Sequence, residues 1–101
     1  MTGPRFDELI HAPIRLSIVS LLAPAQAVEF RFLRERLELS DSVLSKHISA
    51  LESAGYVSSR KENLGRGRRK TWIELTGAGL DAFNGHVAAL DEIVARARGG
   101  T

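Results

Sequence analysis

The sequence contains no cysteine among its 101 residues. Disulfides, thiolate metal sites and cysteine nucleophiles are therefore excluded. No apolar run approaches the ~20 residues that a membrane span needs, and the N-terminal segment carries charged residues early, unlike a signal peptide. We therefore expect a soluble, cytoplasmic protein with no membrane partner.

Catalytic motifs are also missing. The three histidines, His11, His47 and His86, lie in separate segments with no acid at a motif spacing. The motifs HExxH, GxSxG, GxxxxGK and GxGxxG do not occur. Ser45 lies two residues before His47, so the two side chains would point from different faces of a helix. We expect no enzyme activity, no metal and no cofactor, and we place His47 at the edge of a core or helix–helix seam.

The net charge is only +2, but the basic residues are unevenly distributed. Residues 60–70 contain six of the 14 basic residues and a single acid, Glu62, for a local charge of +5. The basic members are Arg60, Lys61, Arg66, Arg68, Arg69 and Lys70. Such clustering is typical of a nucleic-acid contact, and its alternative is a solvated, flexible loop.

A helix is predicted at about 40–54, within LSDSVLSKHISALESAGY. Ser40 is placed to cap its start and Gly55 to end it. Apolar residues recur on one face: Leu44, Ile48 and Leu51. Short polar residues and one cation occupy the other face: Ser42, Ser45, Lys46 and Ser49. This polar face and Ser40 are our candidates for DNA contact, with Lys46 expected to reach a guanine or a phosphate.

The segment before this helix completes a helix-turn-helix pattern. A short helical lead-in at 6–10 and a helix that starts at Pro13 precede a short strand at 28–30. A helix at about 31–37 follows, and its predicted buried side chains are Phe32, Leu33 and Leu37. Only three residues separate it from the next helix, so the two must pack at a steep angle. Its arginines either contact phosphates or form a solvated face paired with nearby acids.

Alternating residues at 56–60 and 71–75 predict a pair of strands. The connection at 62–69 is too long and too rich in glycine for a two-residue turn, so we predict an extended basic tip. Its Arg66-Gly67-Arg68 sequence suits a narrow minor groove. The other cations would contact the flanking backbone and supply salt-dependent affinity.

The order of these elements resembles small MarR-like winged helix-turn-helix transcriptional regulators. The resemblance spans roughly residues 6 to 96 and is carried by HAPIRL at 11–16, LSKH at 44–47, LESAGYV at 51–57 and LTGAG at 75–79. The sequence departs from the family in its shorter terminal helices and in a wing without the usual aspartate. The family's ligand pocket depends on those helices, so an organic effector in a dimer cleft stays an open question.

The C-terminal segment, 77–98, predicts a helix with a narrow apolar seam. The seam residues are Leu80, Phe83, Val87, Leu90 and Val94. At ~1.5 Å per residue this helix is ~33 Å long, more than a small domain readily covers. We expect it to pair with a second copy; the alternative is that it folds back on its own domain.

The sequence thus predicts a mainly α fold with a small β hairpin (α+β). A DNA-binding winged helix-turn-helix domain would span 1–76, a dimerisation helix 77–98 and a tail 99–101. The expected function is transcriptional regulation by a homodimer bound to a pseudo-palindromic site on double-stranded DNA. The alternatives are a winged helix for protein–protein contact and an RNA-binding module.

Overall fold

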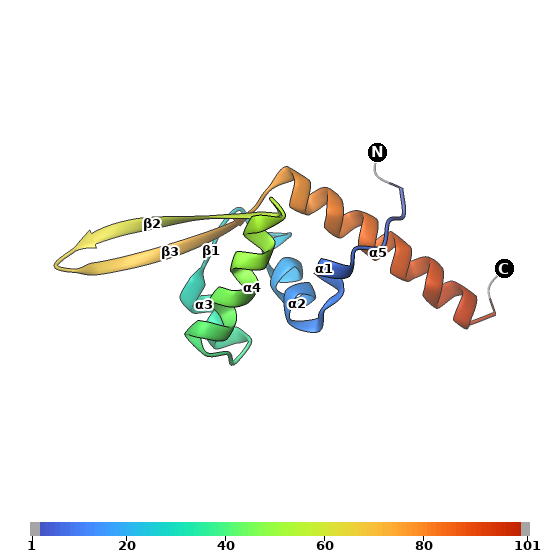
Figure 1. The fold of residues 1–101 in the computed structure, drawn as a ribbon, viewed down its shortest axis with the longest axis horizontal. Coiled ribbons are helices and arrows are strands. Elements are labelled where there is room, and N and C mark those ends of the chain that lie inside the picture. Colours follow the sequence, from blue (N-terminus) through green and yellow to red (C-terminus); the bar gives the residue numbers. More distant parts are fainter. Residues whose placement is uncertain (1–2, 100–101) are drawn as a thin grey trace.

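The structure, a computed structural model, describes residues 3–99. Within these residues the chain forms five helices and a three-stranded antiparallel sheet (Figure 1). The elements are α1 (Glu8–His11), α2 (Pro13–Leu22), β1 (Val28–Glu29), α3 (Phe30–Arg36), α4 (Asp41–Ser53), β2 (Val57–Gly65), β3 (Arg68–Leu75) and α5 (Gly77–Ala97). The predicted fold class is confirmed.

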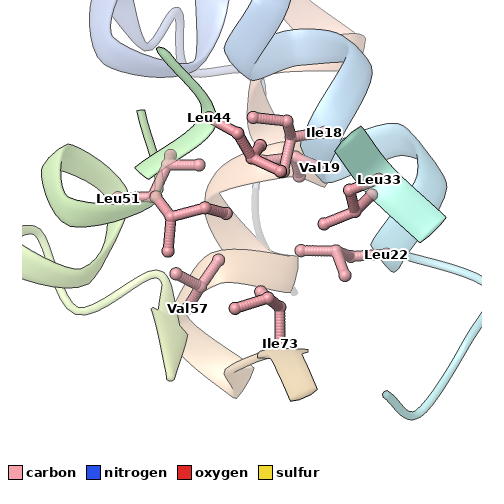
Figure 2. Close-up of a cluster of buried hydrophobic side chains, with 9 residues drawn as sticks. Ile18, Val19, Leu22, Leu33, Leu44, Leu51, Val57 and Ile73 are labelled. Carbon is pink, nitrogen blue, oxygen red and sulfur yellow. The ribbon is translucent and has the colours of Figure 1, made fainter. Parts of the chain in front are cut away.

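The core lies between α2, α3, α4 and the base of the sheet, whose apolar side chains point toward one another in Figure 2. No member is more than 4% exposed: Ile18, Val19, Leu22, Leu33, Leu44, Ile48, Leu51, Val57 and Ile73. The apolar faces predicted for α2 and α4 both point into this cluster. Truncating one such Leu or Ile to alanine typically costs about 2–5 kcal/mol.

The start of α3 corrects one prediction. Phe32 was expected in the core, but its side chain is 49% exposed. The helix begins at Phe30, one residue earlier than predicted, and Leu33 is buried as predicted. Phe32 is two residues from Phe30, about 200° around the helix, so it points the opposite way. The lead-in helix also shifts, because Asp7 caps it and its first residue is Glu8.

Both ends of α4 follow the local signals in the sequence. The Ser40 hydroxyl accepts a hydrogen bond from the amide of Val43 at 3.2 Å. At the other end Gly55 adopts φ +79°, and the amide of Tyr56 donates to the carbonyl of Leu51 at 3.0 Å. This is a Schellman ending, in which the left-handed residue favours glycine. Local hydrogen bonds therefore define both ends of the predicted recognition helix.

The hairpin differs from the predicted open tip at 62–69. The β2–β3 ladder continues to the pair Gly65 and Arg68, and only Arg66 and Gly67 form the turn. Both turn residues have positive φ, 53° and 74°, as in the type I′ turn that matches the twist of paired strands. The prediction that a two-residue turn is excluded was wrong. The hairpin is a long ribbon that protrudes from the body (Figure 1).

An irregularity makes this tight turn possible. The register shifts between Asn63 and Gly65, so that Leu64 is an extra residue in β2. The side chain of Asn63 accepts a hydrogen bond from the amide of Gly65 at 2.9 Å. One inserted residue re-aligns the strands for closure. The sheet order is β1-β3-β2, with Val28 of the short strand β1 opposite Ile73.

Helix α5 starts at a corner that it shares with the end of α4. The hydroxyl of Thr76 caps α5 through the amide of Gly79 at 2.9 Å and donates to the carbonyl of Gly55 at 2.6 Å. A Cβ on Gly79 would lie 2.1 Å from the carbonyl oxygen of Tyr56, so only glycine fits there.

Beyond this corner the first half of α5 contacts α1 and α2, whereas residues 91–99 are exposed. The predicted helix is confirmed, and 100–101 of the predicted tail lie outside the described residues. In the part of the chain that the structure describes, no helix combines the length and the apolarity needed to cross a membrane.

Candidate nucleic-acid interface

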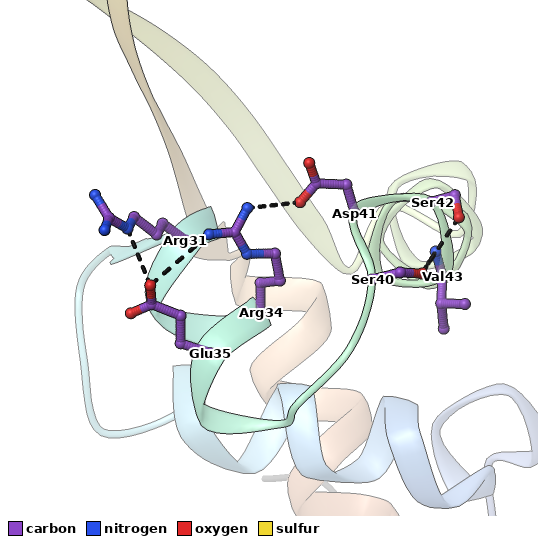
Figure 3. A network of polar contacts seen from close by, with 7 residues as sticks. All are labelled: Arg31, Arg34, Glu35, Ser40, Asp41, Ser42 and Val43. Carbon is purple, nitrogen blue, oxygen red and sulfur yellow. Dashed lines mark hydrogen bonds and ion pairs between the residues drawn. The ribbon is translucent and has the colours of Figure 1, made fainter.

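The polar face of α4 is open to solvent. Its predicted DNA-contacting side chains are all exposed and lie opposite the buried leucines: Ser42, Ser45, Lys46 and Ser49. Ser40 also is exposed, but its hydroxyl caps the helix and lies 3.3 Å from the hydroxyl of Ser42 (Figure 3). One of the free amide N–H groups in the first turn of α4, that of Val43, therefore already has a hydrogen-bond partner within the chain.

An ion-pair network joins α3 to the start of α4 (Figure 3). Arg34 donates from Nη1 to Asp41 at 2.9 Å and lies 3.7 Å from Glu35 through Nη2. Arg31 also donates to Glu35, at 3.0 Å. The hydrogen bond to Asp41 and the charge of that carboxylate raise the pKa of Arg34. Of the two roles left open for these arginines, pairing with acids is therefore the one that Arg31 and Arg34 adopt in the free chain.

The basic residues of the hairpin divide between its two faces. Residues opposite each other in the ladder share a face. Arg60 pairs with Trp72 and Lys70 with Glu62 on one face, whereas Lys61 and Arg69 belong to the face that carries Ile73. Arg66 occupies the turn and Arg68 begins β3. The predicted cluster is thus continuous in sequence but not in space.

Trp72 organises the outer face of the hairpin. The guanidinium of Arg60 lies 5.6 Å and the amine of Lys70 5.8 Å from its ring centroid, distances typical of cation–π contact. The indole N–H donates to Glu62 at 3.3 Å, and Arg60 donates to Glu74 at 3.2 Å. These two cations are held against the ribbon, unlike the arginines of the tip.

A groove of about 340 Å³ separates α4 from the hairpin. Its lining comes from both elements and includes Ser45, Ser49, Glu52, Ser59, Lys61 and Thr71. Ser59 donates from its hydroxyl to Glu52 at 2.8 Å, across the groove. The polar face of α4 and the inner face of the hairpin therefore open onto the same space.

The histidines are placed partly as predicted. His47 is half-buried at the seam between α2 and α4, where it faces Arg15 with a distance of 3.0 Å from Nη1 to Nδ1. Burial lowers the pKa of His47, and the charges of Arg15 and Lys46 lower it further. His11 and His86, expected in unrelated segments, are in contact at 3.2 Å. Only the tertiary fold brings these two together, and no local spacing signals it.

The comparison with known proteins decides the family. A family model described as a winged helix DNA-binding domain matches residues 14–94. This chain belongs to that winged-helix family. It is 34% identical to the uncharacterized protein MJ0432 of Methanocaldococcus jannaschii. The 80 aligned residues cover 79% of this chain and 86% of that relative.

Solved structures of other winged-helix proteins have the same fold as this chain. A transcriptional regulator homologue from Pyrococcus horikoshii OT3 superposes with a TM-score of 0.81 at 26% identity, over 87% of this chain and 86% of that one. The heme sensor protein PefR from Streptococcus agalactiae shares the fold, with a TM-score of 0.76 at 19% identity over 92% of this chain and 64% of its own. The predicted resemblance to MarR-like regulators is confirmed. The winged-helix family and fold are those of DNA-binding transcription regulators rather than of enzymes.

Proposed function

We propose that this winged-helix chain reads a specific double-stranded DNA sequence with α4 in the major groove. The hairpin would lie along the flanking backbone or minor groove. The observation that carries this proposal is the shared groove: Ser45 and Ser49 of α4 and Lys61 of β2 line one space. A duplex seated on α4 would then meet the inner face of the hairpin.

The two elements would have different tasks. On α4, Lys46 and the serines present donors and acceptors to base edges, which carry sequence information. On the hairpin, Arg66 and Arg68 at the tip and Arg69 and Lys61 on the inner face would neutralise phosphates. Phosphate contacts supply affinity and position rather than sequence preference. We assign a smaller share to Arg60 and Lys70, because Trp72 and its neighbours already hold them.

The amide end of α4 is a weaker phosphate site than a free helix end. The Ser40 hydroxyl already accepts from Val43, and the Asp41 carboxylate lies in the first turn. An acid there stabilises the helix dipole but repels a phosphate. Arg34 offsets that charge through its bond to Asp41. We therefore place the main phosphate contacts on the hairpin.

We further propose that two copies pair through α5. Of the predicted seam, Leu80 and Val94 are 40% and 42% exposed, and Ile93 next to it is 43% exposed. Phe83 partly packs against the chain's own core, and Val87 and Leu90 are half-buried. The predicted seam therefore has exposed apolar residues at both ends, Leu80 and Val94, and we propose that a second α5 covers it. A two-fold dimer presents two α4 helices to a pseudo-palindromic site.

The deciding experiment is selection of bound duplexes from a random library, followed by a salt titration on the enriched sequence. We expect a two-fold-related consensus and a log–log slope that contains ~0.9 per neutralised phosphate. No enrichment together with a flat slope would overturn the proposal. Preference for folded RNA over duplex DNA would favour the RNA-binding alternative. Light scattering with and without DNA tests the dimer separately. A chain that binds DNA as a monomer would overturn the proposed pairing through α5 and leave the proposed DNA binding intact.

Lys46→Ala tests the role of α4. Loss of a base contact costs about 1–3 kcal/mol on the preferred site and less on random DNA, so the sequence preference should relax. Ser53→Ala, an exposed change at the end of α4 outside the proposed contact set, is the control. An equal loss of affinity on all duplexes would instead make Lys46 a phosphate contact.

A further inference from the structure

The N-terminal segment 3–7 is fastened to α5 at two successive residues. The amide of Arg5 donates to the carbonyl of Gly85 at 2.8 Å, and the amide of Asp7 donates to Nδ1 of His86 at 3.0 Å. His86 is fully buried although it is polar. Figure 1 shows the N-terminal segment crossing α5 before it enters α1.

These contacts fix the protonation state of His86. A backbone amide can only donate, so Nδ1 of His86 must be an unprotonated acceptor. A neutral imidazole then carries its proton on Nε2. That nitrogen lies 3.2 Å from Nδ1 of His11 and donates to it. Both rings are therefore neutral in this arrangement, and His11 also carries its proton on Nε2.

We infer that His86 and His11 form a proton-sensitive latch that holds segment 3–7 on α5. A protonated imidazole has a donor at each nitrogen. Protonation of His86 places a proton on Nδ1, which then faces the N–H of Asp7 and can no longer accept from it. Protonation of His11 places a proton on its Nδ1, which then faces the Nε2–H of His86 and can no longer accept from it. In either case one bond of the chain from Asp7 to His86 to His11 is lost, which weakens the hold of α5 on segment 3–7.

The surroundings of His86 disfavour its protonated form, because the side chain is fully buried. Phe6 packs against both rings, with its centroid 4.7 Å from that of His11 and 4.7 Å from that of His86. The carboxylate of Asp7 accepts from the Tyr56 hydroxyl at 2.6 Å and from the amide of Ile10 at 3.0 Å, and these bonds direct it away from the two rings.

The charged groups on the other packed elements are directed elsewhere. On α2, the guanidinium of Arg15 donates to the carbonyl of Leu9 and faces His47. Arg5 and Asp81 line a cavity of about 280 Å³ beside Tyr56 and Asp7. Burial lowers the pKa of His86, the nearby His11 lowers it further, and the charge of Asp7 opposes both. The ring is therefore neutral near pH 7 and becomes charged only in more acidic solution.

The latch also reaches the predicted recognition helix. Tyr56, which bonds to Asp7, is the residue whose amide closes the end of α4 on Leu51. Segment 3–7, α1, α5 and the end of α4 are thus joined by one set of hydrogen bonds. All of these bonds lie within one chain and do not depend on DNA binding.

The test uses the full chain without DNA. Histidine ¹⁵N–¹H spectra at about pH 7.5 should show both His86 and His11 with the proton on Nε2, and His86 should titrate below the ordinary value of about 6.5. Amide exchange should show the protection of Arg5 and Asp7 falling about tenfold or more per unit of pH below that titration, after correction for intrinsic exchange. The amide of Ala23, bonded within α2, serves as the internal reference.

Variants separate the latch from general acid sensitivity. The double substitution His11→Gln and His86→Gln keeps donor and acceptor groups that do not titrate, so the protection of Arg5 and Asp7 should no longer depend on pH. His47→Gln should retain the wild-type response. A proton on Nδ1 of His86 at pH 7.5, or unchanged protection of the Arg5 and Asp7 amides through the histidine titration, would overturn the inference. If the double variant does not fold, these two wild-type measurements still decide.

Discussion

Arg34 of α3 reaches across the turn and holds Asp41, the first residue of α4, with 2.9 Å between Nη1 and Oδ1. The pair connects the two helices of the helix-turn-helix at the end where DNA would approach. It also places an anion and its neutralising cation side by side. The free chain therefore keeps one potential phosphate ligand engaged with an acid.

Replacing Asp41 with alanine should strengthen binding to duplexes of any sequence. The change removes a negative charge at the proposed interface and frees Arg34 for a phosphate, so the salt slope should steepen by up to ~0.9. Fluorescence anisotropy at several salt concentrations measures both effects. Glu92→Gln, an exposed change far along α5, controls for net charge. Weaker binding to every duplex would show instead that Asp41 maintains the helix or contacts a base.

The tip of the hairpin should matter more than its base. Alanine at both Arg66 and Arg68 should weaken binding to all duplexes alike and reduce the salt slope by roughly 1.8, about 0.9 for each lost phosphate contact. Arg60→Ala is the matched comparison, and its effect should be smaller because Glu74 and Trp72 already hold that side chain. An equal loss from Arg60→Ala would place the DNA along the outer face of the ribbon.

Two glycines at the start of α5 should respond in opposite ways to alanine. Gly77→Ala meets nothing within 4 Å, so it should stabilise the chain by up to about 1 kcal/mol through helix propensity. Gly79→Ala drives a methyl group into the Tyr56 carbonyl oxygen, and should cost about 1–3 kcal/mol as an overpacked site. Urea unfolding of both variants measures the difference. Equal stability of the two variants would contradict the close approach of α5 to the α4–β2 corner.

Stability should decline in mildly acidic solution. In the folded chain the pKa of His86 lies below its ordinary value of about 6.5, and so does that of His47. Between the folded and unfolded values the unfolded chain binds more protons. The stability from both rings is therefore fully present above about pH 6.5 and is lost as the pH falls from there through the folded pKa values. Urea unfolding from about pH 7.5 to 5 should show this decline. A pH-independent midpoint would mean that folding lowers the pKa of neither ring.

The sequence was most informative where the signals are local. Ser40, the spacing of Leu44 and Ile48, and Gly55 all act within a few residues of α4, and the helix begins and ends within a residue of its predicted bounds. In α3 the predicted burial of Leu33 was correct and that of Phe32 was wrong. Adjacent helical residues lie about 100° apart, and only the packing of α3 on the core decides that Leu33 rather than Phe32 faces inward.

The remaining differences come from non-local contacts. The extra residue Leu64 and the left-handed Arg66 allow the tight turn, and they become apparent only once the two strands are aligned. The same alignment decides that Lys61 and Lys70 lie on opposite faces of the hairpin. His11 and His86 are 75 residues apart in the chain. Their contact depends on how α5 crosses α1, which no pattern along the sequence encodes.

The corner at Thr76 and Gly79 has a consequence for operator geometry. Because Thr76 donates to the carbonyls of both Gly55 and Tyr56, the direction of α5 is fixed relative to α4. In the proposed dimer, the crossing angle of the two α5 helices would then set the separation of the two α4 helices. That separation must match about one turn of DNA, ~34 Å, or a multiple of it. The corner would thus determine which half-site spacing the dimer binds, and the affinity should fall for operators with one base pair added at the centre.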